Sequence, residues 1–260
     1  MDEVLLFEDL GAVARLTLNR PKAMNSLNLA ILERIEQCLV RIAGDDTLRA
    51  VILTGNGAAF CAGADLKEVM AGSALPAGEA DFLDRCNVVF GMLRDFPKPV
   101  IAALNGVTMA GGLELAMCAD IIVAADSATI ADAHANFGVY PGAGGAAVLP
   151  RLIPLNMAMY LLLSGRSLPA SAMQACGLVC EVHPEAELAE ATLKLAQKIA
   201  RHSPIALRRM KEVARSSADK SRTDALLHEQ TMLRQHLRSA DLQEGLQAFA
   251  EKRTPNFQGR

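Results

Sequence analysis

The stretch PVIAALNGVTMAGGLELAMCADIIVAA, residues 99–125, contains two short apolar runs separated by a glycine-rich turn. The runs PVIAAL (99–104) and DIIVAA (120–125) have the length and the β-branched residues of buried strands. The turn after the first run leads into a segment, starting near Gly111, with the composition of a helix. Strands connected through a helix are typical of a parallel sheet that is covered on both faces. The stretch therefore predicts an α/β fold.

The same alternation of strand and helix extends toward the N-terminus. AVARLTLN (12–19) and AVILTG (50–55) predict two more strands. Between them, apolar residues at three- and four-residue spacing predict a helix that starts at Ser26 and is closed by Gly44. Residues 69–82 are rich in glycine and proline, so we expect them to form a mobile surface loop.

The C-terminal part of the chain has a different pattern. After Pro184 the strand signals stop, and helical segments follow, one of them opened by Pro204 and another at roughly 222–239. We therefore expect an α/β core in residues 1–200 and a helical subdomain in residues 201–260.

Composition and charge exclude several classes of protein. The chain has 260 residues, of which 51% are hydrophobic and only 4% aromatic, so we expect a large core packed from small and aliphatic side chains. The formal net charge of −3 argues against a nucleic-acid-binding protein. Residues 201–260 nevertheless carry 12 Lys and Arg against 7 Asp and Glu. This excess indicates either a solvated helical surface or a basic region that helps to bind an anionic ligand.

Neither a metal site nor a membrane segment is indicated. The six cysteines form no CxxC pair, and the five histidines form no cluster with them that has the spacing of zinc ligands. Scattered cysteines without a secretion signal are typical of reduced thiols in the cytosol. The N-terminal MDEVLLFEDL is acidic, unlike a signal peptide, and no apolar run reaches the roughly 18 residues of a membrane helix. We therefore expect a cytoplasmic protein without a metal, whose partners are neither nucleic acid nor a membrane.

Two glycine-rich turns are the first candidates for chemistry. GNGAAFCAGADLKE (55–68) and NGVTMAGGLELAM (105–117) each follow a predicted strand, and their small side chains leave backbone N–H groups accessible. Two such N–H groups, one from each turn, can together hold a thioester oxygen as it becomes an oxyanion. Glycines after a buried strand usually serve only a tight turn, however, and neither stretch has the spacing of a phosphate-binding motif.

Taken together with other segments, the two turns resemble the crotonase family, also called the enoyl-CoA hydratase/isomerase family. The resemblance covers essentially the whole chain and includes LTLNRPKAMNSLN (16–28), FGVYPGAGG (137–145), LLLSGRSLPASAMQACGLV (161–179) and EGLQAFAEKRTPNF (244–257). It implies a spiral of ββα units followed by a C-terminal helical region that assembles the chain into a homotrimer, or into a hexamer of two trimers. It also implies an acyl-CoA thioester as the ligand, and no cofactor other than the coenzyme A of the substrate.

The resemblance assigns roles to particular residues. The oxyanion donors match the backbone N–H groups of Ala62 and Gly111. The residues that match the substrate- and CoA-binding positions are Lys22, Ala23, Ala64, Asp65, Leu66, Tyr140, Pro141, Gly142 and Lys252. Of these, Tyr140 and Pro141 are expected to line the acyl pocket, and Lys252 to contribute from the basic C-terminal helices.

Glu114 stands among glycine, alanine and leucine, where a carboxylate loses hydration that apolar neighbours cannot replace. It matches one of the two family glutamates that act on substrate and water; the alternative is an ion-paired structural glutamate. The second family glutamate, twenty residues further on, is replaced by His134, which can donate and accept a proton near neutral pH. Asp132 could reach the site from a loop, but its expected role is a turn or a cap. A polar pair that often follows PGAGG in the family is replaced by Ala146 and Ala147.

Three interpretations of this altered site are open. His134 replaces the second carboxyl group, or Glu114 works alone in another enolate reaction, or the chain binds acyl-CoA without efficient catalysis. We expect the first: a lyase that reversibly hydrates a 2-enoyl-CoA, in which Glu114 transfers a proton and His134 assists with water. The alternatives are a CoA-thioester decarboxylase, hydrolase or isomerase of the same family, and a non-catalytic acyl-CoA binder.

Overall fold

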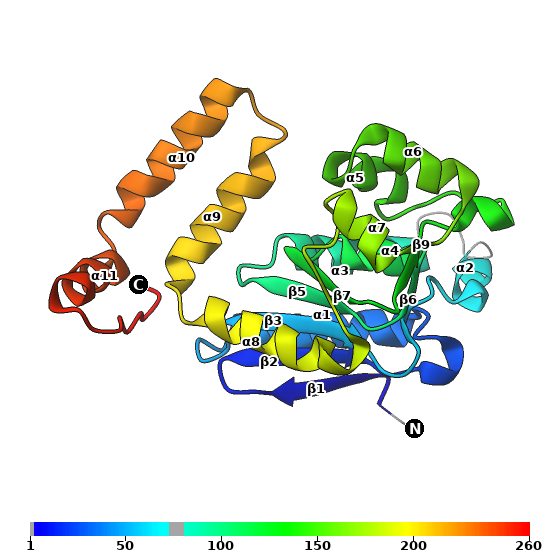
Figure 1. Ribbon diagram of the computed structural model, residues 1–260, viewed down its shortest axis with the longest axis horizontal. Coiled ribbons are helices and arrows are strands. Elements are labelled where there is room, and N and C mark those ends of the chain that lie inside the picture. The colour runs from blue at the N-terminus through cyan, green and yellow to red at the C-terminus, as the bar shows by residue number, and fades with distance from the viewer. Residues whose placement is uncertain (1–2, 73–80) are drawn as a thin grey trace.

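The computed structural model describes residues 3–72 and 81–260. Their strands form two sheets (Figure 1), and one hydrophobic core joins the described elements. The six-stranded sheet has the order β1 (Leu5–Asp9), β2 (Val13–Leu18), β3 (Ala50–Gly55), β5 (Val100–Leu104), β7 (Ile121–Ala125) and β10 (Glu181–His183). β1 and β2 are antiparallel, whereas each further pair in this sheet is parallel. The predicted strands thus form the centre of a largely parallel sheet.

A second, smaller sheet is formed mainly by strands that directly follow those of the large sheet along the chain. Its four strands have the order β4 (Ala59–Cys61), β6 (Val107–Met109), β8 (Thr129–Ala131) and β9 (Leu168–Pro169). β3, β5 and β7 of the large sheet are followed directly by β4, β6 and β8 of the small sheet, and helical segments then return the chain. Each turn therefore adds one strand to each sheet, which is the expected spiral of ββα units.

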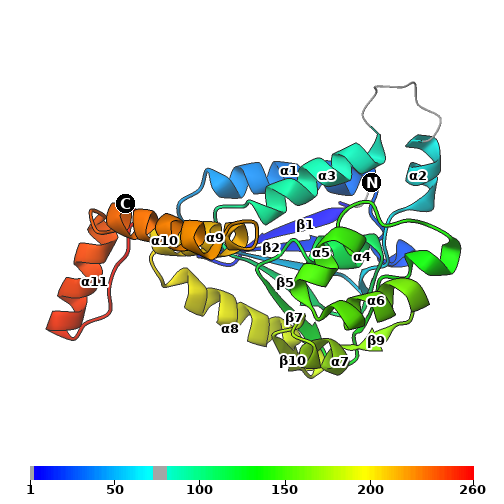
Figure 2. The same cartoon turned by 90° about the horizontal axis from the view of Figure 1, so that it is seen from above.

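Helices cover both faces of the large sheet. α1 (Leu29–Ala43) and α3 (Phe82–Arg94) lie on one side and α8 (Leu188–Ala200) on the other (Figure 2). α1 begins later than predicted because Asn28 is its N-cap and accepts a hydrogen bond of 3.0 Å from the N–H of Ile31. The apolar face predicted for this helix is buried in the core.

The shorter helical segments lie mainly around the small sheet. The α-helices among them are α4 (Gly111–Ala116), α5 (Gly145–Leu152), α6 (Leu155–Ser164) and α7 (Ala170–Ala175). Three single turns of 3-10 helix are η1 (Pro21–Ala23), η2 (His134–Phe137) and η3 (Glu185–Glu187).

The predicted loop at residues 69–82 is wrong at both of its ends. Residues 69–72 belong to α2 (Leu66–Gly72), and Phe82 is the first residue of α3. The glycines and proline that suggested a loop start only at Gly72, whereas most residues before it are good helix formers. Residues 73–80, and with them the expected mobility, lie outside the described part of the chain.

The last helices extend away from the two sheets (Figure 1). They are α9 (Pro204–Ser217), α10 (Arg222–His236) and α11 (Ala240–Glu251). The predicted helix at 222–239 ends earlier because Ser239 caps a separate helix. Asp120, just before β7, holds α9 against the core through ion pairs with Lys211 at 2.7 Å and Arg215 at 2.8 Å. No helix of the described residues has both the length and the apolar composition needed to cross a membrane.

Asn25 fixes the loop after β2 to the loop between β3 and β4. It is fully buried, and its side chain accepts a hydrogen bond of 2.8 Å from the N–H of Arg20. The same side chain donates to the carbonyl oxygens of Asn56 at 3.0 Å and Ala59 at 2.7 Å. These bonds hold η1 beside the start of β4 and so position one side of the site described below.

We expect Asn25→Ala to lower the free energy of unfolding by about 2–3 kcal/mol, because it leaves buried backbone groups without their partner. Urea denaturation followed by circular dichroism measures this change. Asn87→Ala is the matched control, since Asn87 is exposed on α3, and it should change the free energy by less than about 0.5 kcal/mol. Equal losses in the two variants would contradict the role given to Asn25.

Candidate active site

The loops that follow β4 and β6 are packed against each other at one edge of the small sheet. The two strands are parallel neighbours, so their C-terminal ends lie side by side. A Cβ atom on Gly112 would lie 2.1 Å from the carbonyl oxygen of Cys61. A Cβ atom on Gly63, where φ is +115°, would lie 3.1 Å from the Cβ of Ala110 and 3.5 Å from the nitrogen of Gly111. The glycines therefore allow the two backbones to meet.

Two backbone N–H groups in this contact, those of Ala64 and Gly111, have no partner among the described residues. The nitrogen of Ala64 is 3.3 Å from the position that a Cβ atom would take on Gly111, so the two groups are close neighbours. The prediction that Ala62 is the second donor is wrong, because its N–H donates to the carbonyl oxygen of Met24 at 3.0 Å. Ala64 therefore takes the place of Ala62 beside Gly111.

The backbone on either side of these N–H groups is fixed. Leu27 forms an isolated parallel bridge with Ala64: its N–H donates to Gly63 at 2.8 Å, and its carbonyl oxygen accepts from Asp65 at 2.7 Å. Ala110, with φ of +49°, turns the chain from β6 into α4 through a conformation that residues other than glycine rarely adopt. Both N–H groups are thus in place before a ligand binds, which is the arrangement that an oxyanion site requires.

Glu114 lies in the first turn of α4 and is only 4% exposed. Its Oε1 atom accepts hydrogen bonds from the N–H groups of Ala143 at 2.9 Å and Gly145 at 2.8 Å. These backbone donors, rather than an ion-pair partner from the described residues, stabilise the buried carboxylate. Its Oε2 atom accepts no hydrogen bond from the described residues and is not among the fully buried atoms. Oε2 is therefore the oxygen available to a ligand.

His134 follows β8 and opens η2. Its Nδ1 atom is 2.9 Å from Oδ1 of Asp132, because Ala133, with φ of +61°, turns the chain between the two residues. Burial lowers the pKa of His134, but the hydrogen bond to Asp132 and the charges of Asp132 and Glu114 outweigh burial and raise this pKa above its ordinary value. The charge of Glu114 thus acts on His134, as expected of two groups in one site. Their shared role in catalysis remains a prediction.

Asp132 was not predicted as a catalytic residue, but it lies beside His134 in the site. Its side chain is 1% exposed and faces His134 instead of forming the expected turn or cap. Its Oδ2 atom is buried without a hydrogen-bond partner among the described residues. A Cβ atom on Gly145 would lie 2.6 Å from this oxygen and 3.4 Å from Oε1 of Glu114, so the two carboxylate oxygens are at most 6.0 Å apart, the sum of those distances. The acid two residues before His134 was the available signal, but the side chains meet only because the chain turns at Ala133, which the residue type does not indicate.

The segments expected to bind coenzyme A lie beside Ala64. The bridge to Leu27 brings together two pairs of predicted residues, Lys22 and Ala23 from η1, and Asp65 and Leu66 from the start of α2. The carboxylate of Asp65 is 2.9 Å from the guanidinium of Arg20, and this hydrogen bond lowers the pKa of Asp65. Asp65 therefore joins the two segments, while Lys22 and Leu66 are exposed to a ligand.

The loop after η2 contains Tyr140, Pro141 and Gly142. It leads to Ala143, whose N–H group donates to Glu114. Tyr140 is 82% exposed, and a Cβ atom on Gly142 would lie 3.7 Å from Leu83 of α3. This loop therefore borders the site.

Lys252, in contrast, is not brought to the site of its own chain. α11 ends one residue before it and lies at the opposite end of the molecule from α2 in both views (Figures 1 and 2).

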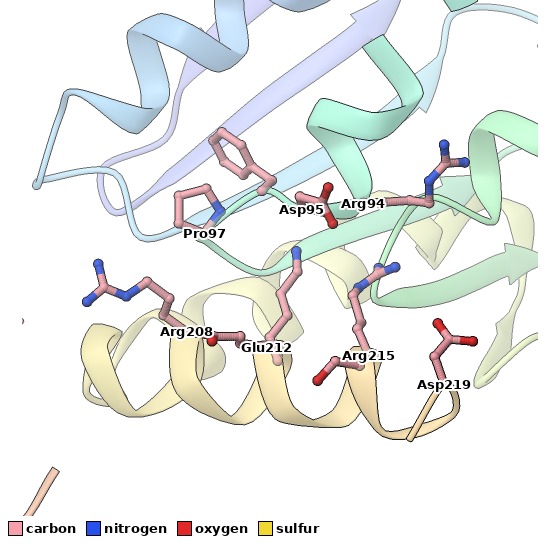
Figure 3. Close-up of a pocket in the computed structure, with 10 residues that line it drawn as sticks. Arg94, Asp95, Pro97, Arg208, Glu212, Arg215 and Asp219 are labelled. Carbon is pink, nitrogen blue, oxygen red and sulfur yellow. The ribbon is translucent and has the colours of Figure 1, made fainter. Parts of the chain in front are cut away.

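A cleft of about 570 Å³ lies elsewhere, between α9 and the segment after α3 (Figure 3). Its charged lining residues are Arg94, Asp95, Arg208, Lys211, Glu212, Arg215 and Asp219. Both acidic and basic groups line it, and Lys211 and Arg215 are already paired with Asp120. The cleft shares no lining residue with the site around Glu114. In the described part of the chain, no group of three or more His, Cys, Asp and Glu residues is arranged to hold a metal ion.

Comparison with known proteins agrees with this geometry. The sequence model of a family described as enoyl-CoA hydratase/isomerase matches residues 8–260. A 2,3-dehydroadipyl-CoA hydratase of Escherichia coli (strain K12) is 39% identical over 95% of this chain and 96% of that protein. A 1,2-epoxyphenylacetyl-CoA isomerase of the same organism is 36% identical over 100% of both chains. The crystal structure of an enoyl-CoA hydratase from Bacillus anthracis has a TM-score of 0.92 and 37% identity, covering 99% of this chain and 100% of that one.

The thiol beside the free N–H groups is expected to be unreactive. Cys61 is fully buried, and burial raises its pKa to about 12. A thiol-specific reagent applied to the native protein near neutral pH should label the exposed Cys180 and leave Cys61 unmodified, as measured by peptide mass spectrometry. Both cysteines should react after unfolding in urea, which is the control. Rapid labelling of Cys61 in the native protein would show that the two loops are not packed as described.

Proposed function

The chain belongs to the enoyl-CoA hydratase/isomerase family, and we propose that it is a hydro-lyase that adds water reversibly to the α,β double bond of a 2-enoyl-CoA thioester. The observation that carries the proposal is the position of Glu114, a buried carboxylate in the same turn as the unpartnered N–H of Gly111. The hydratases named among its relatives, from Escherichia coli and Bacillus anthracis, support the same reaction.

The N–H groups of Ala64 and Gly111 both donate to the thioester oxygen of the substrate. When water attacks the β carbon, negative charge moves onto this oxygen, and the resulting enolate meets two donors that need no rearrangement. Each donor lowers the barrier by on the order of 3 kcal/mol. Lys22, Ala23, Asp65 and Leu66 lie beside Ala64, so the coenzyme A portion extends from the thioester across η1 and the start of α2.

Hydration requires two proton transfers, since water loses a proton and the α carbon gains one. Glu114 and His134 are the groups that carry them. Oε1 of Glu114 and Nδ1 of His134 are already bonded within the protein, so Oε2 and Nε2 are the atoms that exchange protons with the substrate and water. His134 thereby takes the place of the second glutamate that the family resemblance leads us to expect.

The catalytic core is residues 1–200, and residues 201–260 build a homotrimer or a hexamer of two trimers. Large apolar side chains of α10 and α11 are exposed: Leu226, Leu227, Leu233, Leu246 and Phe249. Surfaces of this kind are typical of contacts with another chain. In such an assembly Lys252 contributes to the CoA site of a neighbouring subunit, which agrees with the remote position of α11. Coenzyme A enters as part of the substrate, no other cofactor takes part, and the enzyme works in the cytoplasm.

Glu114→Gln should lower kcat for the hydration of crotonyl-CoA by about 10²- to 10⁴-fold, because the amide keeps the shape of the side chain but cannot exchange a proton. Glu33→Gln, on the exposed side of α1, is the matched control and should leave kcat unchanged. Undiminished hydration by Glu114→Gln would contradict the role of Glu114.

A panel of acyl-CoA thioesters incubated with the wild-type enzyme in heavy water separates the candidate reactions. Mass analysis reports both added water and deuterium at the α carbon. Turnover of malonyl-type, β-diketone or 3-enoyl substrates without hydration would instead assign a decarboxylase, hydrolase or isomerase. Binding of coenzyme A thioesters without any turnover would assign a non-catalytic binder.

Gly111→Ala tests the oxyanion donors separately from Glu114. The added methyl group would lie 3.3 Å from the nitrogen of Ala64 and would occupy the space between the two donors. We expect kcat to fall by about 10²- to 10³-fold while the fold is retained, measured by steady-state kinetics and circular dichroism. Gly91→Ala on α3, where a Cβ atom meets nothing within 4 Å, is the matched control. Equal activity of the two variants would exclude Gly111 from the oxyanion site.

A further inference from the structure

Asp132 has the only fully buried side-chain oxygen without a hydrogen-bond partner in the described part of the chain. An ionised oxygen in such a place is costly unless an opposite charge lies nearby. Two titratable groups lie beside it: His134, which bonds Oδ1 at 2.9 Å, and Glu114, at most 6.0 Å away as argued above from the Cβ position of Gly145. A second acid cannot compensate the charge of Asp132, so the compensating charge is that of a protonated His134.

We propose that Asp132 is a positioning residue that keeps His134 in its imidazolium form, and that this pair delivers the proton to the α carbon while Glu114 accepts the proton of water. The proposal rests on the hydratase function proposed above. It assigns each proton transfer to one group and adds Asp132 to the residues on which the reaction depends.

The hydrogen bonds favour this division of roles. Asp132 accepts the hydrogen of Nδ1, so Nε2 of His134 is the nitrogen left to act, and in the imidazolium form Nε2 also carries a hydrogen. The side chain of His134 is 11% exposed, in contrast to the 1% of Asp132, so a ligand reaches the histidine and not the acid. Glu114 accepts two N–H groups at Oε1, which are stronger hydrogen bonds for a carboxylate than for a neutral acid. Glu114 is therefore suited to be the base.

The charges around His134 act in the same direction. Asp132 and Glu114 are the charged groups that face it, and together they raise its pKa despite burial. α6, which packs against η2, has no Asp, Glu, Lys or Arg between Leu155 and Ser164. Its Tyr160 is bonded to Arg166 at 3.1 Å, and Tyr140 on the following loop is largely exposed. The imidazolium therefore persists to a higher pH than that of a free histidine.

The proton and electron balance of the reaction is complete with these groups. Water gives one proton to Oε2 of Glu114, and its oxygen forms a bond to the β carbon. The electron pair of the double bond moves toward the thioester, whose oxygen becomes negative between the N–H groups of Ala64 and Gly111. The enolate then takes the proton from Nε2 of His134 at its α carbon. Neutral His134 and protonated Glu114 remain, and exchange of protons with solvent restores both after the product leaves.

Asp132→Asn removes the charge and keeps the size of the side chain. In the hydration of crotonyl-CoA we expect kcat at neutral pH to fall by at least about tenfold. The alkaline limb of the pH profile should move to lower pH, because the imidazolium loses the anion that stabilises it. His134→Gln should lack this limb, and the double variant should be no slower than His134→Gln, since Asp132 acts through His134.

Glu181→Gln is the matched control. Glu181 also stands two residues before a histidine, His183, and bonds its Nε2 at 2.9 Å, but the pair lies on the edge strand β10. We expect this variant to leave both kcat and the pH profile unchanged.

Nitrogen-15 NMR of the histidine-labelled protein gives a second readout that does not depend on turnover. We expect His134 to titrate at higher pH in the wild type than in Asp132→Asn. Equal titration in both proteins, or an unaltered pH profile in Asp132→Asn, would overturn the proposal. If Asp132→Asn does not fold, the titration of His134 in the wild type decides: a midpoint above that of a free histidine supports the proposal, and one at or below it overturns the proposal. A wild-type enzyme that hydrates no enoyl-CoA would overturn the proposed function first, whereas hydration with an unaltered Asp132→Asn would overturn only the role of Asp132.

Discussion

The close contact of two backbone segments, one after β4 and one after β6, is the constraint on which the active site depends. It requires a position without a side chain, since a Cβ atom on Gly112 would lie 2.1 Å from the carbonyl oxygen of Cys61. Parallel pairing of the strands places this contact at the C-terminal ends of both. The unpartnered N–H groups of Ala64 and Gly111 follow from it, because each stands where its strand has ended.

The acidic groups of the site are stabilised by local partners. Glu114 is held by N–H groups of the loop that leads into α5, and Asp132 by the imidazole of His134. Gly145 lies where these interactions meet, since a Cβ atom there would be 2.6 Å from Oδ2 of Asp132 and 2.7 Å from the Cβ of Pro141. The segment that leads into α5 thus holds Glu114, and the absence of a side chain at Gly145 leaves room for Asp132.

Much of the fold could be predicted because strands that are buried along most of their length are continuous apolar runs, as in β3 and β5. Glu114 was recognisable because an acid is unusual among small apolar residues. The free N–H group was misassigned because the bond from Ala62 to Met24 joins segments that no local pattern relates. Asp132 was assigned a turn or a cap because its contact with His134 depends on a positive φ at Ala133, which the residue type does not indicate.

Polarisation of a thioester carbonyl by Ala64 and Gly111 is the central claim, and the infrared spectrum of a bound enoyl-CoA with carbon-13 at the carbonyl position tests it most directly. The two donors should draw electron density onto the oxygen, so the isotope-specific carbonyl band is predicted to move to lower frequency on binding than it has in water. A band that stays at its frequency in water would contradict the account, because the oxygen would then be held no more strongly by the protein than by solvent.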